Sequence, residues 1–150
     1  MSIGSNQRAE IIGKSIRELF SVYRDAIRRL NIPETEFWIW YTLVAIEGEH
    51  TQQDICSRWS LPKQTVNTSI TRMRLKKQAY LEAIPGTRNH KVIHLTEAGK
   101  KYGEELISPV TKAEGLSGNR ISDTELETLL SILGKYTDVL REELSSNEKQ

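Results

Sequence analysis

The chain has 150 residues and a formal net charge of +1, and it is long enough to bury a hydrophobic core without disulfides or metal ions. Its single cysteine, Cys56, excludes an internal disulfide framework and fits a reducing compartment. It has no apolar run near the roughly 20 residues of a membrane-spanning helix and no apolar N-terminal stretch of the kind found in signal peptides. These features predict a single-domain cytoplasmic protein that does not enter a membrane.

The first predicted helix covers residues 8–30. Its apolar side chains recur at three- and four-residue spacing, which is typical of an amphipathic helix. Other apolar side chains widen this stripe beyond what one packed helix needs, and a second subunit is the simplest additional partner. The residues of the main stripe are Ile12, Ile16, Leu19, Tyr23, Ile27 and Leu30.

A second helix is predicted to begin at Pro33, because proline suits the first turn of a helix. Glu34 and Glu36 follow in that turn, where acidic side chains interact favourably with the helix dipole. The rest of this helix is apolar on all sides, so we expect it to be buried on all sides and to run through the middle of the fold. Gly48 is expected to end it.

The central segment predicts a helix-turn-helix. A Thr-Gln-Gln-Asp variant of the capping box begins a helix over residues 52–59. A short break at residues 60–62 precedes the second helix of the helix-turn-helix. Pro62 fits the first turn of that helix. The buried stripe of the second helix is Val66, Ile70 and Met73.

The outer side of this second helix has the chemistry needed to read a DNA major groove. Amide and guanidinium groups pair bidentately with base edges, so Asn67 and Arg72 are the strongest candidates for contacts with adenine and guanine. Residues 55–81 contain six Lys or Arg and no Asp or Glu, which favours a polyanion-binding surface over an ordinary solvated one. The predicted DNA-contacting residues are Lys63, Gln64, Thr65, Asn67, Thr68, Thr71, Arg72 and Arg74, of which Lys63 and Arg74 would meet phosphates.

Two short β-prone runs, residues 80–84 and 91–95, follow the helix-turn-helix and are joined by turn residues. A two-stranded ribbon after a helix-turn-helix is a wing, whose tip can reach the DNA backbone or the minor groove. The predicted DNA-contacting residues of the wing are Arg88, Asn89, His90 and Lys91.

Two further helices are predicted after the wing. Thr96 caps the first of them, and Pro109 should kink or end its regular part. Residues 115–120 have the composition of a polar linker. A capping box over residues 122–125 begins the last helix, and its leucine-rich seam over residues 126–144 is typical of a helix that packs along another helix.

The order of these elements resembles the MarR family of bacterial winged-helix regulators. Three motifs carry the resemblance, in the family's order and at its spacing. Residues 32–37 (Ile-Pro-Glu-Thr-Glu-Phe) are similar to the family's Leu-Thr-x-x-Gln-Phe/Trp entry to its second helix. Residues 51–56 (Thr-Gln-Gln-Asp-Ile-Cys), followed by Thr-Val-Asn at residues 65–67, are similar to its helix-turn-helix. Residues 95–99 (Leu-Thr-Glu-Ala-Gly) match its Leu-Thr-x-x-Gly after the wing.

The resemblance implies a mainly α fold that forms a single MarR-like domain over residues 1–150. Its winged helix-turn-helix, a three-helix core with a two-stranded β wing, would form a DNA-binding lobe at residues 32–96. Dimerisation helices would lie at residues 8–30 and 97–146, and a homodimer without a cofactor is expected.

The chain departs from the family pattern at two places. The family's wing usually carries Asp-x-Arg, and Thr87 and Asn89 occupy those positions here, so Arg88 or Lys91 would have to replace the arginine that enters the minor groove. The glycine that usually ends the recognition helix is absent from residues 73–81, so that helix should run longer or end differently.

The resemblance also implies a pocket for a small aromatic or phenolic effector, between the dimer helices and the DNA-binding lobe. Its candidate lining residues, for which plain aromatic core is an equally good interpretation, are Tyr23, Phe37, Trp38, Trp40 and Tyr41.

The cysteine and the histidines are candidates for a redox site and a metal site. Cys56 takes a small, buried helical position, which predicts a core residue in preference to a redox sensor. His50, His90 and His94 match no compact zinc motif, and His90 is better explained as a wing residue near phosphate.

The predicted function is a homodimeric, sequence-specific transcriptional regulator that binds a pseudo-palindromic operator in double-stranded DNA. It would be a repressor released by a small-molecule effector. The alternative is a winged-helix dimerisation or protein-interaction module that does not bind DNA. An enzyme is disfavoured, because the sequence has no Ser/His/Asp spacing, carboxylate pair, phosphate loop or metal motif.

Overall fold

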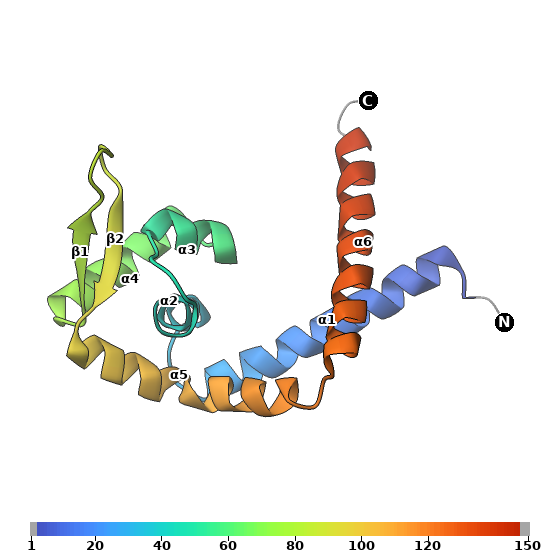
Figure 1. Ribbon diagram of the computed structural model, residues 1–150, viewed down its shortest axis with the longest axis horizontal. Coiled ribbons are helices and arrows are strands. Elements are labelled where there is room, and N and C mark those ends of the chain that lie inside the picture. Colours follow the sequence, from blue (N-terminus) through green and yellow to red (C-terminus); the bar gives the residue numbers. More distant parts are fainter. Residues whose placement is uncertain (1–2, 148–150) are drawn as a thin grey trace. The chain divides into compact units, whose positions relative to one another are not determined.

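The computed structural model describes residues 3–147 of the chain. Its elements, in chain order, are α1 (Ser5–Arg28), α2 (Glu34–Ala45), α3 (Gln52–Trp59), α4 (Lys63–Leu75), β1 (Ala79–Ala83), β2 (Lys91–Leu95), α5 (Glu97–Gly118) and α6 (Asp123–Asn147) (Figure 1). The fold is mainly helical with a two-stranded sheet, which confirms the predicted fold class. Across residues 3–147, none of the helices is both long enough and apolar enough to cross a membrane.

The chain divides into two compact units, Met1–Thr111 and Lys112–Gln150, and the single MarR-like domain stays a prediction. The first unit holds the elements of the winged helix-turn-helix, and the second holds α6 with the end of α5. Every buried hydrophobic residue in the described part of the chain lies at or before Val110. The hydrophobic core therefore belongs to the first unit.

α2 is the buried centre of the first unit. Phe37, Ile39 and Trp40 each have at most 1% of their surface exposed, and α2 contacts α1, α3, α4 and β2. A helix that is apolar on all sides is stable only when other elements surround it, so the predicted central position is confirmed. The helix ends at Ala45, before Gly48, which adopts a φ of +103° in the following turn.

The wing is an antiparallel ribbon in which Ala79 pairs with Leu95 and Ala83 pairs with Lys91. Both predicted strands are present, and the first begins one residue earlier than expected. Thr51, just before α3, forms a bridge to Val92 of β2. The start of the helix-turn-helix is thereby attached to the wing.

The Leu-Thr-x-x-Gly motif joins the wing to α5 for a clear physical reason. The Thr96 hydroxyl accepts a hydrogen bond from the Gly99 backbone N–H at 3.1 Å and donates one to the Lys77 carbonyl at 2.7 Å. The Thr96 N–H also donates to the Gln78 carbonyl at 3.0 Å. A Cβ atom on Gly99 would overlap that carbonyl oxygen and lie 2.8 Å from its carbon. Only glycine lets α5 begin so close to the end of α4.

Pro109 does not end its helix. The sequence predicts a kink or an end there, but α5 continues to Gly118 and includes the first part of the predicted linker. Pro109 and Glu105 are exposed, whereas Ile107 and Val110 are buried. The proline ring and the carbonyl that it leaves without a partner therefore lie on the solvent side, where water can satisfy that carbonyl.

Candidate nucleic-acid interface

α4 buries one side and exposes a polar side. Its inward residues are spaced as in an amphipathic helix and are Val66, Ser69, Ile70 and Met73. Of the residues predicted to contact DNA, Thr65 is half-buried. The others are exposed, and they are Lys63, Gln64, Asn67, Thr68, Thr71, Arg72 and Arg74.

The outermost line of α4 consists of Gln64, Thr68, Thr71 and Leu75, which lie opposite the buried stripe at about 100° per residue. The Thr68 hydroxyl donates to the Gln64 carbonyl at 2.9 Å, so it offers only its acceptor positions to a ligand. Leu75 is 79% exposed and was not predicted as a site residue. Its four-residue spacing from Thr71 could have indicated that it shares the outward side of the helix. A side chain of this kind can contact a thymine methyl group.

The two flanks of α4 differ in what they contact. Lys63, Asn67 and Arg74 lie on the flank that faces α3 and the wing. Arg72 lies on the other flank, where its Nη1 is 3.4 Å from the Glu36 carboxylate of α2. Arg72 is therefore outward-facing as expected, but one of its N–H groups already has an acidic partner. Its contact with guanine stays a prediction.

Hydrogen bonds fix both ends of α3. The Thr51 hydroxyl accepts from the Asp54 backbone N–H at 3.2 Å, and the Asp54 carboxylate accepts from the Thr51 backbone N–H at 2.8 Å, which confirms the capping box. The bond from the Thr51 backbone holds the pKa of the Asp54 carboxyl below its usual range. At the end of α3, Ser60 adopts a φ of +51° and the Leu61 N–H donates to the Cys56 carbonyl at 3.1 Å.

A lysine takes the left-handed position at the end of α4. Lys77 adopts a φ of +56°, and the Gln78 N–H donates to the Met73 carbonyl at 2.8 Å. The Lys77 N–H donates to the Arg74 carbonyl at 2.9 Å. This is the hydrogen-bond pattern of a Schellman motif, whose left-handed residue is usually glycine. The helix ends at Leu75 in the geometry usual with glycine, so the expectation of a longer helix or a different ending is wrong.

A hollow of about 490 Å³ lies between α3, α4 and the wing. Lys63, Arg74 and Lys91 contribute three cationic groups to it, and Asn67 and His90 contribute polar ones. None of its described lining residues is Asp or Glu. A concave, cationic surface without acids suits a phosphate backbone. The remaining lining residues are Thr51, Gln52, Gln53, Cys56, Leu81 and Asn89.

The tip of the wing is exposed, and it holds the predicted contact residues. Gly86 adopts a φ of +79°, and the Thr87 hydroxyl donates to the Ile84 carbonyl at 2.8 Å, which shapes the turn. Thr87 thus has a structural role at one position of the family's Asp-x-Arg. The predicted residues Arg88, Asn89, His90 and Lys91 are all exposed, and the last three line the hollow.

The wing histidines do not form a shared site. His90 precedes β2, whereas His94 lies within it, 3.3 Å from the Glu82 carboxylate and stacked on Tyr80 with ring centroids 5.2 Å apart. Among residues 3–147 there is no group of His, Cys, Asp and Glu side chains that could hold a metal ion.

Cys56 is half-buried, not buried as predicted. It packs against the hydrophobic core on one side and lines the hollow on the other. The side of Cys56 that faces the hollow is not covered, which accounts for the difference.

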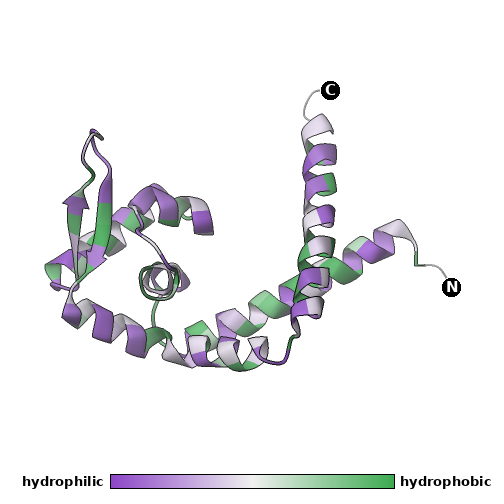
Figure 2. Ribbon diagram, in the orientation of Figure 1, coloured by the Kyte–Doolittle hydropathy of each residue, from purple (hydrophilic) through white to green (hydrophobic). Residues whose placement is uncertain are grey.

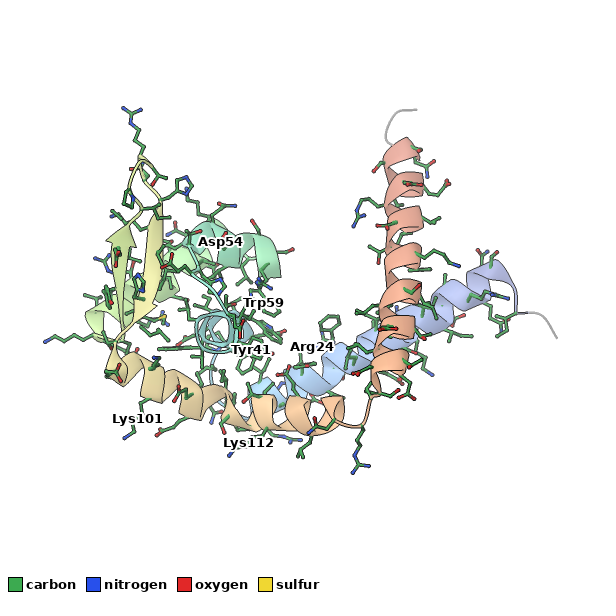
Figure 3. All side chains as sticks on the ribbon, viewed as in Figure 1. Arg24, Tyr41, Asp54, Trp59, Lys101 and Lys112 are labelled. Carbon is green, nitrogen blue, oxygen red and sulfur yellow. The ribbon has the colours of Figure 1, made fainter. Side chains whose placement is uncertain are left out.

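Three of the five candidate effector-pocket residues gather around a fourth, Trp38. Its ring lies 5.7 Å from that of Tyr23, 5.0 Å from that of Phe37 and 5.4 Å from that of Tyr41, measured between centroids. Trp59 of α3 joins them, stacked on Trp38 with ring centroids 4.2 Å apart and 6.1 Å from the ring of Tyr41. Figure 3 labels Trp59 and Tyr41, which lie near each other. Trp59 is not among the candidate pocket residues that the sequence indicates. We call these five residues the aromatic cluster.

Trp40 does not belong to the aromatic cluster. Its ring packs on Tyr102 of α5 with centroids 5.0 Å apart, and a Cβ on Gly103 would lie 2.8 Å from it. The spacing of two residues from Trp38 places Trp40 on another side of α2. The structure therefore does not bring Trp40 together with Trp38, and its role in an effector pocket stays a prediction.

Buried hydrogen bonds hold the aromatic cluster in place. The Trp59 indole N–H donates to the Thr42 hydroxyl at 2.7 Å, and that hydroxyl donates to the Trp38 carbonyl at 2.7 Å. The Trp38 indole N–H points to the Glu34 carboxylate at 3.4 Å. α3 is thus attached to α2 through both aromatic stacking and hydrogen bonding.

Comparison with solved structures gives related folds over most of the chain. A MarR family regulator from Neisseria meningitidis matches with a TM-score of 0.77 and 26% identity, covering 93% of this chain and 98% of that one. S. aureus MepR in its DNA-binding conformation matches with a TM-score of 0.66 and 20% identity, covering 89% and 98%. A MarR family protein from Bacillus stearothermophilus matches with a TM-score of 0.62 and 19% identity, covering 93% and 99%. No family model and no curated protein matches the chain.

These matches span the winged helix-turn-helix and the helices on either side of it, in the order that the three sequence motifs predict. The chain therefore has the fold of the MarR family of winged helix-turn-helix regulators.

Proposed function

We propose that the chain is a sequence-specific, DNA-binding transcriptional regulator. The observation that carries this proposal is the outward polar face of α4 beside a cationic hollow whose described lining has no acid. Amides and hydroxyls on that face have the donors and acceptors needed for base edges, while the hollow suits the phosphate backbone. S. aureus MepR, which has the same fold, forms a complex with DNA.

We propose further that the protein acts as a homodimer. Apolar side chains recur along α1 and along α6 (Figure 2), and the structure leaves many of them exposed. Leu19, Phe20 and Val22 of α1 are each more than half exposed, and no residue of α6, all of which is described, is buried. Rows of exposed apolar side chains along a helix are unfavourable in water, and another chain can cover them. A second copy is the simplest cover, and its two-fold symmetry suits a pseudo-palindromic operator.

The proposed effector site is the aromatic cluster. Its rings come from α1, α2 and α3, so a small aromatic or phenolic molecule bound among them would press on the helix that precedes α4. Such a ligand releases DNA only if it prefers the arrangement that does not bind DNA. In this proposal the protein is a repressor, and the effector relieves repression.

A salt titration tests the DNA-binding proposal. Affinity for double-stranded DNA should fall steeply as salt rises, because each neutralised phosphate contributes a slope of about −0.9 to a plot of log K against log [salt]. The measurement is fluorescence anisotropy with duplexes enriched by the protein from a random-sequence library. An absence of binding at low ionic strength would instead support a protein-interaction module without DNA.

A paired substitution in α6 tests the dimer. Leu133→Glu puts a charge into the apolar seam, whereas Lys135→Glu adds an acid outside that seam. The first variant should be monomeric by light scattering and should lose operator binding, while the second should stay dimeric. A Leu133→Glu monomer that binds the operator as tightly as the unmodified protein would contradict the two-fold arrangement.

A further inference from the structure

An acidic residue from α2 reaches the DNA-facing helix. The Glu36 Oε2 atom lies 3.4 Å from Nη1 of Arg72, and their side chains are 17% and 53% exposed. Glu36 sits in the first turn of α2, next to the fully buried Phe37, so the rigid central helix fixes its position. Arg72, at the exposed end of the pair, is the side chain that this contact restrains.

This ion pair makes the charge of Arg72 less available to a ligand than the charges of the other cations on α4. Among the described side chains, Lys63 and Arg74 form no ion pair, whereas Arg72 has a carboxylate beside it. The segment of residues 55–81 contains no acid of its own, so the negative charge at this surface comes from a different helix. A carboxylate this close offsets the arginine charge and repels a nearby phosphate.

We propose that Glu36 is a specificity-determining residue that restrains Arg72 and so lowers affinity for DNA of arbitrary sequence. The proposal rests on the proposed DNA-binding function. Binding to arbitrary DNA comes from cations that neutralise phosphates and release counterions, so an arginine held by a carboxylate contributes less to it. Contacts of Gln64 and Asn67 with bases do not depend on this charge. Glu36 therefore raises the ratio of specific to non-specific affinity.

The test compares Glu36→Gln with Glu34→Gln in otherwise intact protein. Both substitutions remove one acid from the first turn of α2, but the Glu34 carboxylate accepts from the Trp38 indole N–H and holds no arginine. Each variant is titrated with salt against an enriched duplex and against a mixed-sequence duplex of equal length. Glu36→Gln should steepen the salt slope on mixed sequence by about 0.9, so that affinity falls roughly 3.5-fold more between about 50 and 200 mM salt. Glu34→Gln should leave the slope unchanged.

An Arg72→Ala background separates restraint of the arginine from a general loss of negative charge. Glu36→Gln should have no effect on the slope in that background, because the cation it would release is gone. An equal gain in affinity with and without Arg72 overturns the proposal. Weaker binding to the enriched duplex with an unchanged slope also overturns it, because that result would mean that Glu36 orients Arg72 for base reading.

Two controls keep these outcomes clear. Circular dichroism melts of each variant establish that the fold is retained before binding is compared. Failure of the unmodified protein to bind either duplex refutes the proposed function itself, whereas normal binding with no change in Glu36→Gln refutes only the role of Glu36.

Discussion

Three glycines of α5 provide a graded test of how closely this helix approaches the rest of the fold. Alanine is the better helix former by about 1 kcal/mol, so a helical glycine that has open space around it should gain stability when replaced. A Cβ on Gly115 would meet nothing within 4 Å. Gly115→Ala should therefore raise the free energy of unfolding by about 0.5–1 kcal/mol.

The other two glycines should respond with the opposite sign. A Cβ on Gly103 would lie 2.7 Å from a methyl group of Val44 and 2.8 Å from the Trp40 ring, both side-chain atoms. Overpacking of this kind costs about 1–3 kcal/mol. A Cβ on Gly99 would overlap the backbone carbonyl of Gln78, which has no freedom to rotate away. Gly99→Ala should therefore cost about 3 kcal/mol or more, because the start of α5 must move.

The three variants are compared by urea unfolding at one fixed protein concentration, since an oligomer has concentration-dependent stability. Far-ultraviolet circular dichroism reports the helices, and tryptophan fluorescence reports the surroundings of Trp40. The expected order of stability is Gly115→Ala, unmodified protein, Gly103→Ala and Gly99→Ala. Equal stability of Gly99→Ala and Gly115→Ala would show that α5 does not begin against the Gln78 carbonyl.

Three further substitutions test local features. Lys77→Gly should raise the free energy of urea unfolding by about 0.5–1 kcal/mol, because glycine adopts the left-handed conformation without strain. The lowered pKa of Asp54 means that its carboxylate stabilises the folded state above about pH 4, and this contribution is lost as pH falls through the folded-state pKa. Between neutral and acidic pH, the melting temperature of Asp54→Asn should therefore fall by less than that of the unmodified protein. Thr42→Val removes the acceptor of the Trp59 indole N–H and should lower the free energy of urea unfolding by about 1–2 kcal/mol. Thr42→Ser keeps the hydroxyl and should lower it by less. Equal losses in the two variants would show that the hydroxyl is not needed.

The sequence predicts the order of the elements well, because each one depends on local chemistry. The apolar residues around α2 require burial on every side, and the structure places Phe37, Ile39 and Trp40 in the core. The capping box at Thr51 fixes the start of α3 whatever the rest of the chain does. Three- and four-residue spacing likewise separates the buried and outward sides of α4, and the outward side carries most of the residues predicted to contact DNA.

Features that depend on contacts between elements could not be predicted in this way. The pairing of Arg72 with Glu36 joins residues far apart in the sequence, and no local pattern indicates it. Trp59 joins the aromatic cluster only because α3 packs on α2. Trp40 lies outside it because its side of α2 faces α5. The left-handed conformation of Lys77 is equally hidden, since lysine carries no preference for it.

α2 is the element through which the proposed effector and DNA sites would influence one another. Within a few residues it carries Glu36, which holds Arg72 of α4, and Trp38, which stacks on Trp59 of α3. A ligand among the aromatic rings that displaces Trp59 must strain its 2.7 Å hydrogen bond to Thr42 or move α3 relative to α2. Because α3 and α4 are joined by the short turn at Ser60, movement of α3 would shift the outward face of α4 against the DNA. In this proposal the coupling needs no flexible segment, because it would pass through two contacts of one buried helix. A ligand that leaves the Trp38–Trp59 stack unchanged should then leave operator affinity unchanged as well.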